Sequence, residues 1–288
     1  MTNRYVHGYG RRENERLQDQ AEALVELLHA DTSYPEGSLV LEAGCGVGAQ
    51  TLSLATRSPG AAFLSIDISP AALAETQRVI DAAGITNVQL RQADILDLPF
   101  EPESFDHIFI CFVLEHLSDP GRALVSLRGL LRKGGTITVI EGDHGSAYFH
   151  PDHPAARAAI ECLVELQRRA GGNGLIGRQL YPLLVETGFD GVAVSPRLVY
   201  VDSSRPDLVD AFTRKTFTAM IEAVRQDAIA ASLIDAATFD AGIDALHRTT
   251  EADGVFLYTF FKATARTPLS LRRSAPGDVT RGRHPRRA

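Results

Sequence analysis

Cysteine is scarce in this sequence of 288 residues. The three cysteines, Cys45, Cys111 and Cys162, are odd in number and lie far apart. They predict neither a disulfide framework nor a zinc site with paired cysteine ligands. We therefore expect free thiols in a reducing, cytoplasmic compartment.

Long hydrophobic runs are also missing. The longest apolar run, residues 108–114, is the size of a strand and falls well short of the roughly 18 residues that a transmembrane helix requires. The first twenty residues lack the apolar core of a signal peptide. We expect no contact with a membrane. Hydrophobic residues still make up 44% of the chain, which is enough to bury a sizeable core.

The body of the chain has no excess of basic over acidic residues. The formal net charge is -7, and because residues 266–288 hold seven Arg against one Asp, the rest carries -13. An acidic body argues against nonspecific binding of nucleic acids or anionic membranes. Residues 266–288 are rich in Arg, Pro, Gly and Ser, which predicts a basic, disordered tail that could still contact polyanions.

Apolar runs and helical patterns alternate along the first half of the chain. Leucines at helical spacing predict an N-terminal helix within residues 13–30. Strands are expected at residues 38–42, 62–67, 88–91, 105–112 and 136–142, and helices from about residue 48, from Pro70 to Gly84 and from Pro120 to about residue 131. This βαβ order requires a parallel sheet with helices on its faces.

The second half of the chain follows another pattern. A polar stretch at residues 143–154 precedes helices at 155–170 and 178–187, and alternating segments at 191–201 and 254–265 predict antiparallel strands. The mostly helical residues between these strands are interpreted as a lid. Its apolar side chains Phe212, Phe217, Met220 and Phe239 could line an acceptor pocket or could simply pack the helices together.

The strongest local motif is a glycine-rich turn after the first strand. Residues 41–48 read LEAGCGVG, with glycines at every second position. Glycine lets the backbone approach a ligand, and the helix that follows offers free N–H groups. Gly44, Gly46 and Ala49 also satisfy the looser pattern of NAD-binding folds, so dinucleotide binding is an alternative at this point.

Acidic residues near the ends of the first three strands narrow the choice of ligand. Glu42 would suit a cationic ammonium group better than a pyrophosphate, which it would repel. Asp67 closes the second strand and can accept both hydroxyls of a ribose, in a nucleoside or in NAD. Asp94 could accept a hydrogen bond from an adenine amino group, with Ile95 packing on the ring. NAD enzymes have no standard acid there.

The ordered series of motifs resembles the class I S-adenosylmethionine-dependent methyltransferases over about residues 38–141. The series comprises EAGCGVG, Asp67, the sequence QADI at 92–95, FDHIF at 105–109, LEHL at 114–117 and LRKGG at 131–135. The family often has LKPGG at the last position, and the missing proline changes only a turn. The chain as a whole also resembles actinobacterial natural-product enzymes that methylate the C3 carbon of an indole, although no single motif carries this second resemblance.

The resemblance implies an α/β fold with a Rossmann-like sheet. Its strand order is 3-2-1-4-5-7-6, with strand seven antiparallel and the cofactor across the carboxyl ends of strands one to four. An N-terminal helix and a helical lid between strands six and seven complete the fold. We expect a cap segment and helix at 1–37, the cofactor-binding core at 38–204, the lid at 205–250, the last core strand at 251–265 and the tail at 266–288.

The cofactor that the resemblance implies is S-adenosylmethionine, which leaves as S-adenosylhomocysteine. Each part of it has expected contacts: Glu42, Gly44, Cys45, Gly46 and Gly48 for the methionine part; Asp67 and Ile68 for the ribose; Asp94 and Ile95 for the adenine; and Cys111, Phe112 and His116 for the sulfonium side. Arg16, with Tyr9 and Gln20, is expected to close the methionine end. Cys111 and His116 have packing within the core as an alternative role.

Candidate acceptor residues follow the fifth strand. Some acceptors lose a proton on methylation, so a His, Asp, Glu or Tyr beside the methyl group is expected. The catalytic candidates are Glu141, Asp143 and His144 together with His7 and Tyr9, and the candidates for binding the acceptor are Arg178, Tyr181 and Tyr5. The nearby His150, Asp152 and His153 match no familiar metal spacing, so we expect a solvated loop and no metal.

These residues predict a methyltransferase for a small-molecule acceptor, from specialised or quinone-type metabolism. The acceptor atom expected from the resemblance is indole C3 of a tryptophan-derived diketopiperazine, and a quinone-type ring carbon is the alternative. Two alternatives from other functional classes stay open: a noncatalytic S-adenosylmethionine-binding regulator and an NAD oxidoreductase. The sequence leaves the oligomeric state open, with a homodimer among the alternatives.

Overall fold

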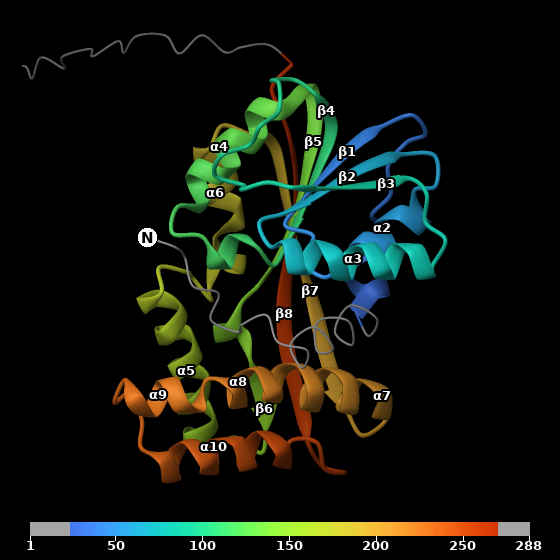
Figure 1. The fold of residues 1–288 in the computed structure, drawn as a ribbon. Coiled ribbons are helices and arrows are strands. Elements are labelled where there is room, and N and C mark those ends of the chain that lie inside the picture. The colour runs from blue at the N-terminus through green and yellow to red at the C-terminus, as the bar shows by residue number, and fades with distance from the viewer. Residues whose placement is uncertain (1–23, 270–288) are drawn as a thin grey trace, which may run out of the picture.

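The computed structural model describes residues 24–269. Within this range a single sheet of eight strands forms the centre of the fold (Figure 1). The strands are β1 (Leu39–Ala43), β2 (Ala62–Asp67), β3 (Val88–Gln92), β4 (Phe105–Cys111), β5 (Leu131–Gly142), β6 (Tyr148–His150), β7 (Asp190–Asp202) and β8 (Val255–Arg266).

The strand order confirms the fold expected from the sequence. The strands run β3-β2-β1-β4-β5-β8, with β7 on the far side of β8. Neighbours among β1 to β5 are parallel, while β8 is antiparallel to both β5 and β7. Expected strands six and seven are therefore β7 and β8. The carboxyl ends of the five parallel strands meet at one edge of the sheet.

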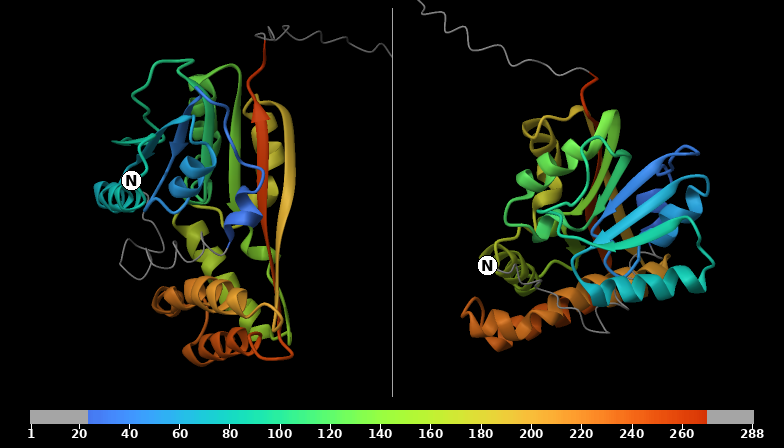
Figure 2. Two further views of the ribbon diagram at one scale, coloured as in Figure 1. Left: turned by 90° about the vertical axis from the view of Figure 1, so that its right-hand side faces the viewer. Right: turned by 45° about the horizontal axis from the view of Figure 1, so that its top comes forward.

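Helices cover both faces of this sheet. Residues 24–29 form helix, and α2 (Thr51–Arg57) and α3 (Pro70–Ala82) lie on the same side of the sheet, while α4 (Pro120–Leu130) and α6 (Leu180–Glu186) lie on the other (Figures 1 and 2). Leu24, Leu28 and Leu54 share a buried cluster on the first side. Leu124 and Leu180 belong to a second cluster. Local sequence sets these helices: the side chain of Ser69 caps α3, with proline in the first turn.

Strands β7 and β8 extend beyond the edge at which the parallel strands end. The half of β8 from Phe260 onward pairs with β5, and the residues before it, Val255–Leu257, pair with β6. Strand β7 accompanies β8 from Asp202 back to Asp190. The sequence predicted only a polar stretch at residues 143–154, whereas part of it forms the short strand β6. The prediction missed this strand because its partner lies more than one hundred residues further along the chain.

A second group of helices packs around this extension of β7 and β8 (Figure 1). They are α5 (Pro154–Arg169), α7 (Pro206–Leu208), the π-helical segment η4 (Val209–Thr218), α8 (Ala219–Ala223), α9 (Arg225–Ala230) and α10 (Ala236–Arg248). The insertion between β7 and β8 confirms the expected position of the helical lid. The remaining short turns are η1 (Leu114–His116), η2 (His144–Ser146) and η3 (Ile176–Gln179).

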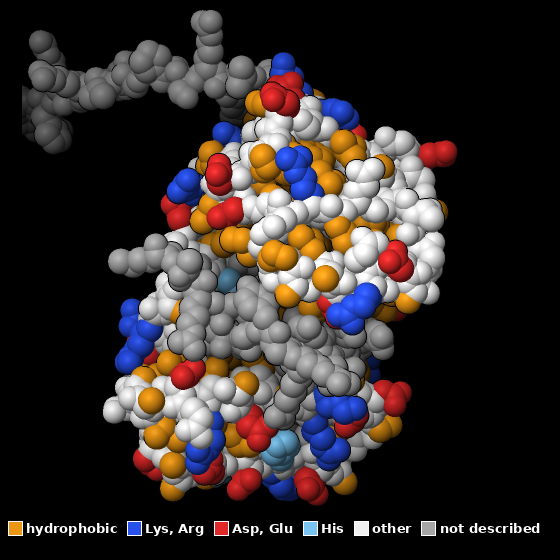
Figure 3. Space-filling model, viewed as in Figure 1, with side chains coloured by type: hydrophobic (Ala, Val, Ile, Leu, Met, Phe, Trp, Pro, Cys, Tyr) orange, Lys and Arg blue, Asp and Glu red, His pale blue; other side chains and the backbone are white. Residues whose placement is uncertain are grey.

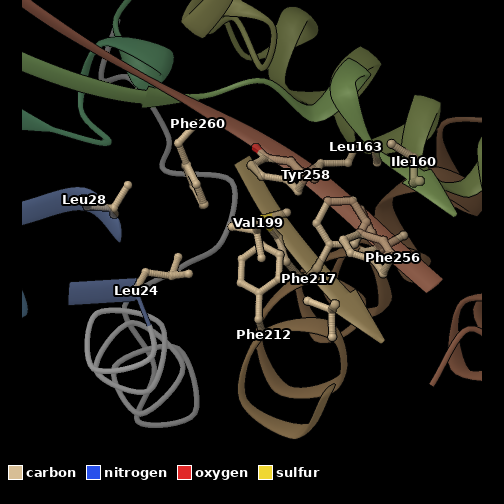
Figure 4. Close-up of a cluster of buried hydrophobic side chains, with 14 of the residues drawn as sticks. Leu24, Leu28, Ile160, Leu163, Val199, Phe212, Phe217, Phe256, Tyr258 and Phe260 are labelled. Atoms are coloured by element: carbon tan, nitrogen blue, oxygen red, sulfur yellow. The ribbon is translucent and has the colours of Figure 1, made fainter. Parts of the chain in front are cut away.

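Aromatic rings of the lid pack against aromatic rings of β8. The ring of Phe217 lies 4.7 Å from that of Phe256 and 5.4 Å from that of Tyr258, and Phe212 lies 6.0 Å from Phe260 (Figure 4). Phe212, Phe217 and Phe239 are at most 1% exposed. Their burial favours the packing role, which the sequence left as an alternative to a pocket wall.

Candidate active site

The glycine-rich turn leads from β1 to α2 with three glycines in the left-handed region. Their φ angles are +81° at Gly44, +55° at Gly46 and +80° at Gly48. A Cβ on Gly44 would lie 2.4 Å from Cγ2 of Val113, whereas a Cβ on Gly46 would meet nothing within 4 Å. Gly44 thus allows close packing against the segment after β4. Gly46 presents its backbone to open space, as a cofactor would need.

Asp67 ties this turn to the end of β2. Its carboxylate accepts hydrogen bonds from the backbone N–H of Gly46 (2.9 Å) and of Ser69 (2.8 Å). The structure thereby brings together two residues that the sequence assigned to the methionine part and the ribose. Ile68, next to Asp67, is 56% exposed.

Glu42 lies inside the protein, behind the glycine-rich turn. Its Oε2 accepts hydrogen bonds from the hydroxyl groups of Thr51 (2.8 Å) and Ser65 (2.6 Å). Burial raises the pKa of Glu42 to about 7, and the hydroxyl bonds lower it only partly. Cys45 is also buried, and burial raises the pKa of its thiol. The side chain of Glu42 therefore links the start of α2 to β2 from inside the protein.

Asp94 and Ile95 follow β3, as expected. Asp94 is half-buried and accepts a hydrogen bond from the backbone N–H of Leu96 (2.8 Å), which shapes the turn. Ile95 is half-buried and packs against the second core cluster. Both residues thus lie at the same edge of the sheet as Asp67.

The segment after β4 is held by a carboxylate from β5. Oε1 of Glu141 accepts hydrogen bonds from the backbone N–H groups of Val113 (3.0 Å) and Leu114 (2.8 Å). Phe112, immediately before them, has a φ of +58°, a strained conformation for an aromatic residue. The ring of Phe112 lies 5.3 Å from that of Phe260. Glu141 therefore holds this strained segment in place.

Buried polar side chains from four elements meet next to this segment. The hydroxyl oxygen of Tyr258 lies 3.0 Å from Nδ1 of His144, and Nε2 of His144 lies 3.4 Å from Oε2 of Glu115. Nε2 of Gln167 donates to the same Glu115 oxygen (3.2 Å). We call Glu115, His144, Gln167 and Tyr258 the polar cluster. Sequence reasoning selected only His144 from it.

Two carboxyl groups can lie in this region because the surroundings favour the neutral form of one of them. Glu141 is completely buried, and its burial together with the charge of Glu115 raises its pKa well above the ordinary value. His116 lies at the margin, with Nε2 3.6 Å from Oε1 of Glu115 and 21% of its side chain exposed. The polar cluster therefore approaches the surface along η1.

Arg178 and Asp143 form an ion pair beside the polar cluster. Nε and Nη2 of Arg178 donate to the two oxygens of Asp143 at 2.6 and 2.7 Å. The carboxylate of Asp143 is 2% exposed, so the guanidinium neutralises a buried charge. This pairing accounts for the position of Arg178 at the start of η3–α6 without a ligand.

Comparisons with known proteins identify the family. A model described as a methyltransferase domain matches residues 41–139. Phosphatidylethanolamine N-methyltransferase of Cereibacter sphaeroides is 33% identical over 58% of this chain and 73% of its own length. The chain belongs to the class I S-adenosylmethionine-dependent methyltransferases.

A further relative supports this assignment, and a solved structure shares the fold. Demethylmenaquinone methyltransferase of Thermus thermophilus is 35% identical over 35% of this methyltransferase and 46% of its own length. In fold, phosphoethanolamine N-methyltransferase 2 of Haemonchus contortus matches with a TM-score of 0.53 at 16% identity, over 87% of this chain and 52% of the other. The first curated relatives are matched over 34 to 52% of their own length.

The family decides between the two cofactors that the glycine pattern left open. S-adenosylmethionine is the cofactor, and the NAD alternative is set aside. The open face of Gly46 and the acid at the end of β2 fit a nucleoside with a methionine tail. The individual contacts of Glu42, Asp67, Asp94 and the other expected residues stay predictions.

Several expected site residues of the methyltransferase lie elsewhere or outside the described residues. Tyr181 on α6 is 56% exposed and points to solvent rather than into the polar cluster. Cys111 is 8% exposed and packs in the first core cluster. The predictions for Tyr5, His7, Tyr9, Arg16 and Gln20 fall on residues 1–23, and most of the predicted tail falls on 270–288, outside the described part of the chain.

The loop that suggested a metal has ordinary contacts. Nδ1 of His153 caps α5 by accepting from Ala155 N–H (3.2 Å), and Asp152 pairs with Arg157 (2.8 Å). Between residues 24 and 269, the His, Cys, Asp and Glu side chains form no group of three or more that could hold a metal ion. No helix in this range is long and apolar enough to cross a bilayer. Acidic and basic side chains are interspersed on the face shown in Figure 3.

Proposed function

We propose that this methyltransferase moves the methyl group of S-adenosylmethionine to a small-molecule acceptor bound beside the segment after β4. One observation supports this most strongly: the open glycine-rich turn and the strained Phe112 segment lie together, through the contact of Gly44 with Val113. The turn would hold the cofactor, and the segment would face its reactive end.

The residues of the chain mainly provide alignment. S-adenosylmethionine supplies an activated methyl group, so transfer depends on holding a nucleophile in line with it. Asp67 fixes the turn through Gly46, and Glu141 fixes the backbone of Val113 and Leu114. Both side chains therefore restrict the geometry in which cofactor and acceptor meet.

The acceptor expected from the sequence, indole C3 of a tryptophan-derived diketopiperazine, is part of this proposal. The adjacent rings of Phe112 and Phe260 suit a flat aromatic acceptor. The polar cluster offers groups that can take the proton lost by the indole nitrogen. A quinone-type ring carbon is the alternative acceptor, because its hydroxyl groups would meet the same surroundings.

Acceptor profiling tests the proposal. Purified protein would be incubated with S-adenosylmethionine and either tryptophan-containing diketopiperazines or quinols, and products would be followed by a mass increase of one methyl group. We expect methylated product together with S-adenosylhomocysteine. Cofactor that binds without turnover in either set or in cell extract would instead support the noncatalytic regulator.

Assembly and location also remain proposals. A homodimer is the assembly to test, by light scattering of the purified chain at several concentrations. A mass of one chain, about 31.2 kDa, at every concentration would exclude it. A cytoplasmic location is expected and would be checked by fractionation.

A further inference from the structure

The polar cluster contains more unmatched hydrogen-bonding capacity than a packed core tolerates. Nε2 of His144, Oε1 of Gln167 and Oε2 of the neighbouring Glu141 are buried without a hydrogen-bond partner. The side chains of all three residues are more than nine-tenths buried. Buried polar atoms are almost always paired, so three unpaired atoms in one region indicate a ligand that completes them.

The unmatched atoms of His144 and Gln167 lie close together. A Cβ on Gly174 would meet Oε1 of Gln167 at 2.1 Å and Cδ2 of His144 at 2.8 Å. The carbonyl of Gly174 accepts the backbone N–H of His144 (2.9 Å). Glycine at this position therefore lets both side chains pack against its backbone, and any larger residue would displace them.

Tyr258 contacts the other ring nitrogen of His144. Burial raises the pKa of Tyr258 well above its ordinary value, so its hydroxyl keeps the proton and can donate a hydrogen bond to Nδ1 of His144 at 3.0 Å. Nε2 of His144 faces Oε2 of Glu115 at 3.4 Å, with no hydrogen bond between them. Glu115 also accepts a hydrogen bond from Gln167, and a carboxylate in this position can accept a proton from a bound ligand.

The charges beside the cluster select the ligand. Glu115 supplies a negative charge, which together with burial raises the pKa of Glu141, and the nearby guanidinium of Arg178 is already paired with Asp143. The carboxylate of Glu115 and the amide oxygen of Gln167 attract hydrogen-bond donors, and the carboxylate repels anions. An acceptor whose polar group is a carboxylate or a phosphate would therefore be disfavoured here.

We propose that Glu115, His144 and Gln167 form a subsite for a nitrogen-bearing acceptor, an amine or an N–H heterocycle, and that Glu115 takes the proton this nitrogen loses. In the transfer, the lone pair of an amine, or the ring carbon of the heterocycle, forms a bond to the methyl carbon. The bond from that carbon to sulfur breaks, and its electron pair stays on sulfur. The nitrogen then gives its proton to Glu115, which releases it to water.

This inference rests on the proposed function, and a binding experiment separates the two. The protein would first be titrated with S-adenosylhomocysteine and then, in its presence, with benzylamine or benzoate, which share size and shape but differ in charge. We expect benzylamine to bind at least tenfold more tightly than benzoate.

Two variants locate the effect. Glu115→Gln should weaken benzylamine binding at least tenfold, and Gln167→Leu should weaken it several-fold. Glu161→Gln, an exposed change on α5, serves as the matched control and should change nothing. Affinity for S-adenosylhomocysteine should stay within threefold in all three variants, which also shows that they fold.

Each result has one meaning. Benzoate binding as tightly as benzylamine, no benzylamine binding, or unchanged binding in both Glu115→Gln and Gln167→Leu would overturn the subsite. In those cases S-adenosylhomocysteine binding would still uphold the proposed function. Failure of the wild-type chain to bind S-adenosylhomocysteine would overturn the proposed function itself.

Discussion

Replacement of Glu42 by glutamine should make the protein more stable at alkaline pH and leave it nearly unchanged at acid pH. The carboxyl group is 2% exposed, and burial raises its pKa from the ordinary 4.5 to about 7. Between these two values the folded state holds a proton that the unfolded state has lost. Stability contributed by this group therefore falls as the pH rises through this window.

The size of the effect follows from the pKa. A change of one pKa unit corresponds to about 1.4 kcal/mol, so ionisation of Glu42 should lower the free energy of unfolding by about 3 kcal/mol above pH 7. Glutamine keeps a carbonyl oxygen for the hydroxyl groups of Thr51 and Ser65 and has no charge to bury. Glu42→Gln should thus gain up to about 3 kcal/mol at pH 8.5, or roughly 6–12 °C in Tm.

Urea unfolding of wild type and variant at pH 5 and pH 8.5 measures this directly. Glu186→Gln, an exposed change on α6, controls for the general loss of one acidic group. The quantity of interest is the difference between variant and wild type at the two pH values. A variant that is destabilised equally at both would show that Glu42 is ionised and favourably bonded in the folded protein, contrary to our account.

Other substitutions test the anchoring of the N-terminal helix and the two roles of glycine. Lys262→Met should destabilise the protein by about 1–3 kcal/mol in urea unfolding. The buried ammonium of Lys262 donates hydrogen bonds to the carboxylate of Asp31 (2.6 Å) and to a backbone carbonyl at the helix end. A loss of less than about 0.5 kcal/mol would refute this role. Gly46→Ala should weaken S-adenosylhomocysteine binding at least tenfold in calorimetry at a stability cost of about 1 kcal/mol, since its Cβ would enter open space. Gly44→Ala, which would strike Val113, should instead cost more stability than Gly46→Ala, and equal costs would contradict the distinction.

Local signals made much of the fold predictable. The bounds of β2 match the expected 62–67, and α3 begins at the predicted Pro70 because the Ser69 cap and the proline act within a few residues. The strand order could be expected only through the family resemblance. Strand β6 has three residues and depends on pairing with Val255–Leu257, which no local pattern encodes.

The site was only partly predictable for the same reason. The glycines, Asp67 and Asp94 lie directly after strands, where position along the chain fixes position at the edge of the sheet. Tyr258 meets His144 across 114 positions, and Gln167 meets Glu115 across 52. Glu115 stood in the recognised LEHL motif, but nothing in the sequence indicated that it, rather than His116, would carry the buried contacts.

The most direct test of the central claim is a calorimetric titration of the purified chain with S-adenosylmethionine, S-adenosylhomocysteine and NADH. It would be repeated with Asp67→Ala and with Asp81→Ala, an exposed control on α3. We predict binding of the first two ligands, loss of that binding in Asp67→Ala and no change in Asp81→Ala. Binding of NADH alone would contradict the account and would make the glycine-rich turn a dinucleotide site.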